Sequence, residues 1–176
     1  MTWIITAGGT QFDLLNPTAS AVHPRDIAAS LARICRFNGH CRDHYSVAEH
    51  SLRVAALVAP EHKLVALLHD ATEAYVGDMV SPLKQMLPAY QQIEQRIWHI
   101  ICERFGISPT LPAEVHQADL TMLATERRDL MPAHPDEWAC LAGVTPISGV
   151  IKPLTATHAR FYYEKALLSA LGGAAQ

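Results

Sequence analysis

The chain has 176 residues, of which 49% are apolar and 18% are charged, and its formal net charge at pH 7 is −3. This length fits one domain with a sizeable core, so residues 1–176 are expected to form a single domain. The composition excludes a disordered chain. The small negative charge argues against a nucleic-acid polymer as partner, because backbone binding needs clustered lysine and arginine.

Export and membrane signals are missing from the sequence. No apolar run approaches the roughly 20 residues that span a bilayer, and the N-terminal segment lacks the charged start and long apolar run of a signal peptide. The four cysteines form no Cys-x-x-Cys pair. We therefore expect reduced thiols, no membrane partner and a cytoplasmic location.

The hydrophobic spacing predicts an all-α fold, a helical bundle of about six or seven helices with a small N-terminal β-hairpin. The hairpin is expected over residues 2–14, where two β-prone runs flank Ala-Gly-Gly. Helices are expected over residues 23–35, 46–58, 61–75, 82–86, 89–105, 112–131 and 155–171.

Local signals mark several of the helix ends. Ser46 followed by Glu49 is a capping box at the start of one helix. Gly77 and Gly106 are expected to stop two others. Residues 131–153 contain four prolines, which predicts an irregular excursion before the last helix.

Polar residues occupy apolar faces in three of these helices. His50 shares its face with Val47, and Asp119 lies four residues after an apolar valine. His69 and Asp70 directly follow an apolar run. A buried carboxylate is costly unless it is paired or binds a metal. Two imidazoles and two carboxylates form a set that suits Mn²⁺, Co²⁺, Fe²⁺, Zn²⁺ or Mg²⁺.

Spacing alone leaves two interpretations open for these residues. A single inward histidine is more often a hydrogen-bonded core residue than a ligand, and Asp119 could pair with an arginine or cap a helix. Their joint occurrence on inner faces favours a metal site over chance. Periodicity by itself leaves the two interpretations about equally supported.

Three stretches carry a resemblance to a known family. "SVAEHSLRVA", "LLHDATEAYVGDMVSPLK" and "VHQADLTML" resemble the HD-domain metal-dependent phosphohydrolases, and most of all the bacterial 5′-deoxynucleotidases and phage or prophage dATP triphosphohydrolases. The resemblance runs from about residue 24 to about residue 130, with the motifs in one order. It implies an all-α HD-domain fold.

The resemblance also implies a set of site residues. Glu73 and Asp78 would be catalytic, with Glu73 near the attacking water and Asp78 facing the 3′-hydroxyl of the sugar. In one continuous helix, Glu73 would lie one turn from the metal ligands on nearly the same face. The implied ligands of one divalent metal ion (Co, Mn, Zn, Mg or Fe) are His50, His69, Asp70 and Asp119.

Substrate contacts follow from the same resemblance. Arg36 and Lys84 would contact the phosphate. Phe37 stands where the deoxynucleotidases have tryptophan, near the base or sugar, and Gly39 adds room in the same loop. The stretch 131–153 has no counterpart in the family, and it is expected to cover the pocket or to form a subunit contact.

The implied activity is hydrolysis of deoxyribonucleoside 5′-phosphates by water attack at the α-phosphorus, which releases the deoxynucleoside. The substrate would be a monophosphate, a triphosphate such as dATP, or both. The resemblance further implies a homo-oligomer, a dimer or hexamer, in the cytoplasm of a bacterium or of a phage-infected bacterial host.

Other functions stay open at this point. The chain could hydrolyse another phosphoester such as a guanosine alarmone, although Asp78 suits a 3′-hydroxyl better than a 3′-pyrophosphate. It could be a non-catalytic module that binds a metal or nucleotide. Against this, all four metal-ligand positions and the catalytic position, Glu73, hold the residue types that the family's activity requires. A structural zinc site at Cys35, His40, Cys41 and His44 is disfavoured, because the spacing fits no zinc-finger pattern.

Overall fold

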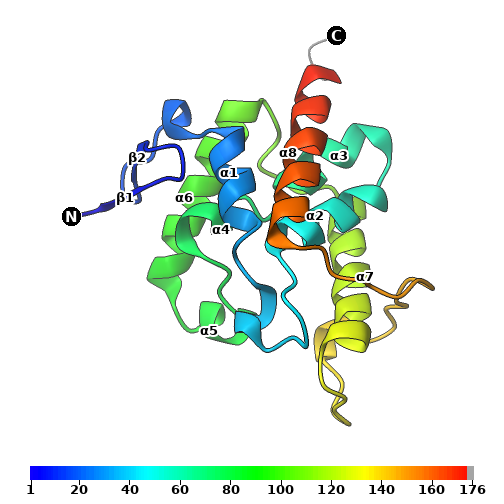
Figure 1. Ribbon diagram of the computed structural model, residues 1–176. Coiled ribbons are helices and arrows are strands. Elements are labelled where there is room, and N and C mark those ends of the chain that lie inside the picture. The colour runs from blue at the N-terminus through cyan, green and yellow to red at the C-terminus, as the bar shows by residue number, and fades with distance from the viewer. Residues whose placement is uncertain (174–176) are drawn as a thin grey trace.

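The computed structural model describes residues 1–173 and confirms the predicted all-α fold behind a small N-terminal β-hairpin (Figure 1). The three helices α3, α4 and α5 are short, and the others carry most of the core. The elements are β1 (Trp3–Ile5), β2 (Gln11–Asp13), α1 (Pro24–Leu31), α2 (Val47–Ala56), α3 (Lys63–Leu68), α4 (Glu73–Val76), α5 (Ser81–Gln85), α6 (Pro88–Phe105), α7 (Ala113–Leu130) and α8 (Ala156–Gly173).

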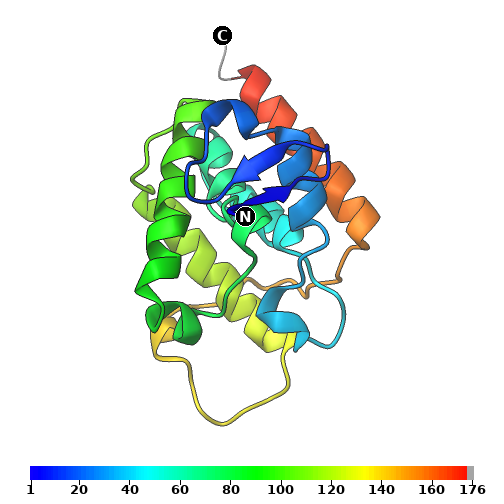
Figure 2. The same cartoon turned by 90° about the vertical axis from the view of Figure 1, so that its left-hand side faces the viewer.

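The hairpin lies against the helices as a small cover (Figure 2). Its strands are antiparallel, with Ile4 opposite Phe12. The ring of Phe12 is fully buried and stacks on Tyr75 of α4 with 3.9 Å between ring centroids. This contact joins the hairpin to the segment that follows His69 and Asp70.

Helix α2 lies at the centre of the bundle and contacts α1, α3, α7 and α8. The Ser46 side chain caps it by accepting a hydrogen bond from the Glu49 backbone N–H at 3.1 Å, as predicted. Val47, His50 and Val54 are fully buried along one face. Because α2 is surrounded, a side chain on that face can meet groups from several other elements.

The helix predicted over residues 61–75 is not continuous. It ends at Leu68 and resumes at Glu73, with turns between them. In the break the backbone bonds span three residues: Ala71 N–H donates to the Leu68 carbonyl at 2.9 Å, and Glu73 N–H to the Asp70 carbonyl at 3.1 Å. The prediction of one continuous helix over these residues is therefore wrong, because a tighter turn of the 3-10 type joins Leu68 to Glu73.

The first predicted helix is shorter than its hydrophobic pattern suggests. It starts at Pro24 as expected and ends at Leu31. A turn follows at Ala32 and Arg33, and the chain then pairs with the segment before α2: Val47 N–H donates to the Ile34 carbonyl at 3.1 Å, and Cys35 forms a bridge with Ser46. This pairing sets the start of the loop that carries Arg36.

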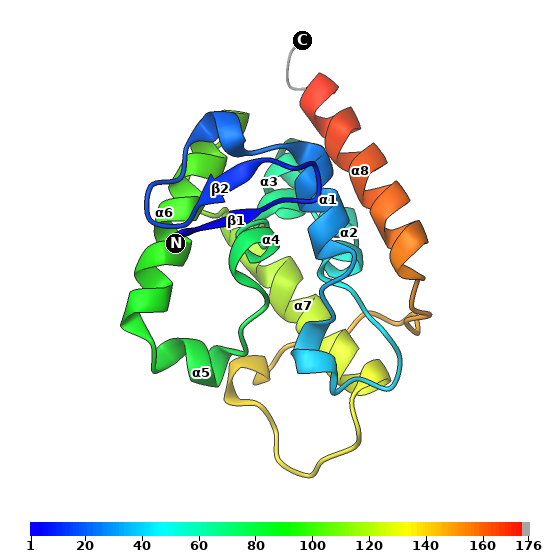
Figure 3. The same cartoon turned by 60° about the vertical axis from the view of Figure 1, so that its left-hand side comes forward.

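The predicted stops and the irregular excursion are also found. Gly106 ends α6 in the left-handed conformation (φ 66°), which costs glycine little. Residues 131–155 form the excursion, with one 3-10 turn at Ala139–Leu141. It leaves the end of α7, loops outward and crosses back to α8 (Figure 3). Within residues 1–173, none of the helices combines the length and the apolar character that crossing a bilayer requires.

Candidate metal centre

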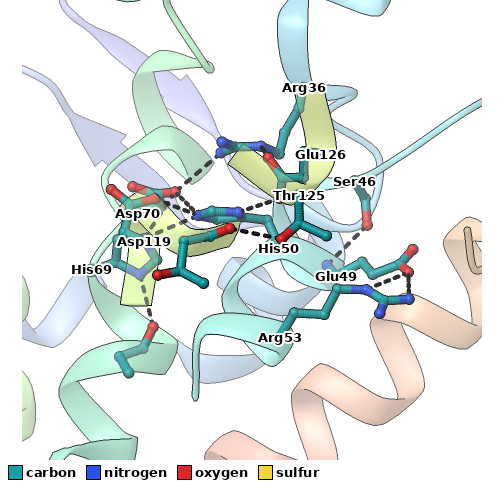
Figure 4. Close-up of polar contacts among 12 residues, drawn as sticks. Arg36, Ser46, Glu49, His50, Arg53, His69, Asp70, Asp119, Thr125 and Glu126 are labelled. Carbon is teal, nitrogen blue, oxygen red and sulfur yellow. Dashed lines mark hydrogen bonds and ion pairs between the residues drawn. The ribbon is translucent and has the colours of Figure 1, made fainter. Parts of the chain in front are cut away.

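Three side chains from different elements converge between α2 and α7 (Figure 4). His50 comes from α2, His69 from the turn after α3, and Asp119 from α7. His50 Nε2 lies 3.3 Å from His69 Nε2 and 3.1 Å from Asp119 Oδ1. The ligand atoms of this group all lie within 4.8 Å of one another, so the group could bind a metal ion.

The other ring nitrogen of each histidine is already engaged. His50 Nδ1 lies 2.6 Å from Glu126 Oε1, and His69 Nδ1 lies 2.8 Å from the Ala66 carbonyl oxygen. Both partners are acceptors, so each Nδ1 carries a proton, and in the neutral imidazole each Nε2 presents a lone pair to the cluster. Two lone pairs facing each other across 3.3 Å need a cation or a proton between them. The donor set therefore fits a metal ion.

Charges around the cluster favour a positive charge inside it. Burial would raise the pKa of Asp119, but the bond from His50 and the positive charge of the histidines hold it well below its usual range. Burial and the nearby Arg36 oppose protonation of His50, yet Glu126 and Asp119 outweigh them and raise its pKa to about 9. Negative groups thus surround the two imidazoles.

Asp70, the fourth predicted ligand, lies at the edge of the same cluster. Its Oδ2 is 3.3 Å from His69 Nε2 and 3.5 Å from His50 Nε2. The same oxygen is 3.5 Å from Arg36 Nη1. Asp70 is therefore close to both the histidines and the predicted phosphate-binding arginine.

Glu73 is a buried carboxylate without a hydrogen-bond partner at Oε2. Burial raises its pKa well above the usual value, and the charges of Asp70 and Asp78 add to this effect. Asp78 is half-buried, and burial raises its pKa as well, although Arg36 opposes the shift. Both acids interact electrostatically with the Arg36 guanidinium. Glu73 and Asp78 therefore belong to the same site as Arg36.

Arg36 is buried beside the cluster, at the start of a strained loop. Its Nε donates to Glu126 Oε2 at 3.1 Å. Phe37 and Asn38 have φ values of 57° and 51°, in the left-handed region that non-glycine residues rarely adopt. Gly39 follows with φ 78°, which explains a glycine at this position. Such strained conformations persist where surrounding contacts hold the backbone in place. Here the three positive φ values turn the chain directly after Arg36.

Phe37 and Lys84, two further predicted contacts, are partly exposed, and we call their part of the site its mouth. Lys84 Nζ forms an ion pair with Glu94 Oε1 at 2.7 Å. Burial raises the pKa of Glu73 and of Asp78, and the charge of Lys84 opposes this rise, so Lys84 lies near both acids. The Phe37 ring faces Trp138 from the excursion, with 6.2 Å between ring centroids.

Sequence reasoning missed Glu126, which is fully buried on α7 and bonds both His50 and Arg36. The signal was present, because Glu126 lies seven residues, about two turns, after Asp119 and so on the same helix face. The disfavoured zinc site gains no support. Cys35 and Cys41 have their sulfurs 3.5 Å apart, but in residues 1–173 no third converging ligand joins them.

A cavity of about 780 Å³ lies elsewhere, between α2, α3 and the end of α8, where its wall includes Leu52, Val65 and Ala166. None of the clustered acids or histidines lines it. The candidate site is therefore recognised by its converging ligand atoms, and not by cavity size.

The sequence is similar to those of two bacterial proteins. No protein-family model matches it. It is 44% identical over 163 residues to the uncharacterized protein YfdR of Escherichia coli, and the alignment covers 90% of each chain. The chain belongs to the YfdR family. It is also 38% identical over 126 residues to the uncharacterized protein RCAP_rcc00048 of Rhodobacter capsulatus, covering 66% of this chain and 64% of that one. Neither name states an activity, so the function must be argued from the site.

Proposed function

We propose that the protein is a metal-dependent phosphohydrolase of the HD-domain type that acts on deoxyribonucleoside 5′-phosphates. One observation supports the proposal most strongly. The buried carboxylate of Glu73, which has no hydrogen-bond partner at Oε2, interacts electrostatically with Asp70 and Arg36, next to the cluster of His50, His69 and Asp119. Metal ligands, an acid with a raised pKa and a buried cation together suit attack of water on a phosphate ester.

One divalent metal ion, drawn from Co, Mn, Zn, Mg or Fe, would be held by His50, His69 and Asp119, with Asp70 as the fourth ligand. When bound, such an ion acts as a Lewis acid toward a phosphoryl oxygen and favours ionisation of water. The two Nδ1 bonds would keep the imidazoles oriented so that Nε2 can bind the ion.

Glu73 has the properties of a general base. Its Oε2 is free of hydrogen bonds, and burial raises its pKa toward the range in which a carboxylate takes up a proton effectively. In the proposed reaction the Glu73 carboxylate accepts a proton from water as the water oxygen bonds to the α-phosphorus. The bond from phosphorus to the 5′-oxygen breaks, and the proton taken up by Glu73 passes, directly or through water, to that oxygen as the deoxynucleoside leaves.

Positive side chains would offset the charge of the phosphate. Arg36 is fixed at Nε by Glu126 and extends Nη1 toward Asp70 at 3.5 Å, so its outer nitrogens face the reacting groups. Lys84 would approach from α5. Asp78, half-buried next to both, would accept a hydrogen bond from the 3′-hydroxyl of the sugar.

A product-resolved activity screen tests the proposal. The four deoxynucleotides, each as monophosphate and as triphosphate, are incubated with the protein and Mn²⁺, Co²⁺ or Mg²⁺, and the products are separated by chromatography. Release of the deoxynucleoside is expected, with phosphate from the first set or triphosphate from the second. Hydrolysis of a guanosine alarmone alone, or metal binding without any turnover, would contradict it. The same preparations can be sized to test the proposed homo-oligomer.

A substitution separates catalysis from metal binding. Glu73→Gln should keep Mn²⁺ affinity but lose at least about 100-fold in rate, the scale of general acid–base catalysis. Glu103→Gln, which changes an exposed glutamate of α6, serves as the control and should leave both quantities unchanged. Near-normal turnover by the Glu73→Gln protein would rule out the proposed role of this residue.

A further inference from the structure

Glu126 joins two groups that have different tasks in the proposed reaction. Its side chain is fully buried on α7. One carboxylate oxygen lies 2.6 Å from His50 Nδ1, and the other accepts the Nε–H of Arg36 at 3.1 Å (Figure 4). We propose that Glu126 is a positioning residue that orients a metal ligand and the phosphate-binding arginine together. The part that concerns Arg36 rests on the proposed function.

The bond to His50 determines which nitrogen faces the cluster. Because Glu126 accepts a hydrogen bond from Nδ1, the lone pair of the neutral imidazole is at Nε2, 3.1 Å from Asp119 and 3.3 Å from His69. A carboxylate in this position also makes the imidazole a better electron donor. Without it, the ring could turn or adopt the other tautomer.

The bond to Arg36 sets the plane of the guanidinium. The Nε–H is held by Glu126, so the outer nitrogens point the other way, and Nη1 reaches 3.5 Å from Asp70. The arginine is buried, and it follows directly on the extended segment that pairs with the start of α2. Loss of the Glu126 charge would leave a buried cation without its closest partner and free to rotate about its side-chain bonds.

A single carboxylate can do this because it offers two acceptors and no donor. Glutamine has the same shape but only one acceptor oxygen, and its amide nitrogen is a donor. Glu126→Gln can therefore satisfy His50 or Arg36, but not both. The distinctive consequence is that one substitution should weaken both metal binding and phosphate binding.

The full chain offers a matched control on α2. Glu49 is also buried, with its side chain 1% exposed. It accepts from Arg53 Nη2 at 2.6 Å and from the Leu154 backbone N–H at 2.7 Å. Figure 4 shows this network apart from the histidines. Glu49→Gln thus removes an equally buried charge that has no bond to the cluster.

The test measures Mn²⁺ binding to metal-free protein by calorimetry, and inhibition by inorganic phosphate at saturating Mn²⁺. Glu126→Gln is expected to weaken Mn²⁺ binding by about 10- to 100-fold, the range for groups that orient metal ligands, and to weaken phosphate inhibition as well. Arg36→Lys should weaken phosphate inhibition alone. Glu49→Gln should change neither quantity by more than about twofold.

Two outcomes would overturn the proposal. One is a folded Glu126→Gln protein with wild-type Mn²⁺ affinity, and the other is an equal loss in Glu49→Gln, which would indicate a general effect of burying an amide. If Glu126→Gln does not fold, Glu126→Asp keeps the charge and shortens the reach by one methylene. It should weaken Mn²⁺ binding by a smaller factor, and unchanged affinity would again overturn the proposal.

The proposed function and the role of Glu126 can fail separately. If the wild-type protein hydrolyses no deoxynucleotide, the proposed activity is wrong. The Mn²⁺ affinities of Glu126→Gln and Glu49→Gln still decide whether Glu126 supports the metal ligands, because that measurement needs no substrate.

Discussion

The inner and outer sides of the candidate site are held in different ways. On the inner side, His50 and Glu126 are fully buried and bond to each other, and His69 is fixed by a backbone carbonyl. On the outer side, Lys84 is paired with Glu94 in a contact that stays partly exposed. Buried hydrogen bonds to charged groups are strong, whereas exposed ion pairs contribute little.

The excursion shows the same contrast along its own length. Its returning half is fixed to two helices. On α7, Thr125 and Asp129 accept the backbone N–H groups of Ile147 and Ile151 at 3.1 and 2.8 Å, and on α2 Glu49 accepts the Leu154 N–H at 2.7 Å. Its outgoing half, with Trp138, contacts α7 mainly through Arg127, which bonds a backbone carbonyl and covers the Trp138 ring. We infer that ligand geometry is fixed by the fold, while the mouth can adjust to what binds.

The largest effect is expected on the inner side. His69→Ala removes one of the three converging ligands and should lower Mn²⁺ affinity by more than about 100-fold, beyond the loss from an orienting group alone. Calorimetry on metal-free protein measures this. His99→Ala, at an exposed position of α6, is the matched control. Equal affinity in the two variants would show that the cluster is not the metal site.

A smaller effect is expected for the sugar contact. The wild-type protein should prefer a 2′-deoxynucleotide over the 2′,3′-dideoxy analogue by roughly tenfold, because one hydrogen bond to a charged group is worth about 1.5 kcal/mol or more. Asp78→Ala should remove that preference. The ratio of kcat/KM for the two substrates is the measurement. A preference that survives the substitution would assign the 3′-hydroxyl to another residue.

The outer ion pair should give opposite shifts of only a few-fold. Lys84→Ala should raise KM, because a positive charge near the phosphate is lost. Glu94→Gln should lower KM about two- to fivefold, because Lys84 then no longer pairs with the Glu94 carboxylate and is free to bind the phosphate. A partly exposed ion pair of this kind is worth up to about 1 kcal/mol. If both substitutions raise KM, the Lys84–Glu94 pair has a structural role. The outer side of the site would then be held as firmly as the inner side.

The smallest effect concerns the anchor of the excursion. Hydrogen bonding from Arg128 lowers the pKa of Asp129, which also accepts from the Ile151 N–H. A lowered pKa means that the ionised form stabilises the fold above about pH 4, and that this stabilisation is lost as the pH falls through the folded pKa. Asp129→Asn should cost about 1 kcal/mol at pH 7.

Thermal unfolding at several pH values checks this prediction. The difference in Tm between wild type and Asp129→Asn should shrink as the pH is lowered from 7 toward 3. A difference that stays constant over this range would mean that the Asp129 charge does not contribute. Asp136→Asn, in the exposed outgoing half, should leave Tm unchanged at both ends of the range.

Much of the fold was predictable because it depends on local signals. Proline at the start of α1, Ser46 at the start of α2 and Gly106 at the end of α6 act within a few residues of themselves. The position of His50 and Asp119 on inner faces followed from helical periodicity. Their meeting as a cluster did not follow from it, since periodicity fixes a face and not the neighbour across it.

The errors share a physical cause. Both differences occur where the chain contacts residues far away in the sequence. The break between Leu68 and Glu73 carries side chains of the cluster, and the residues after α1 pair with the segment before α2. Local propensity favours helix there, and tertiary contacts override it. Glu126 was missed for a related reason, because a glutamate near the end of a helix usually faces solvent.

The two unequal halves of the excursion have a consequence for divergence among relatives. Because the return from Ile147 to Leu154 is fastened to α2 and α7, the segment from Pro132 to Pro146 can gain, lose or exchange residues without disturbing the ligands. Insertions are tolerated best in such exposed loops. We expect members of the family to keep the same chemistry and to differ in substrate choice through this one replaceable loop.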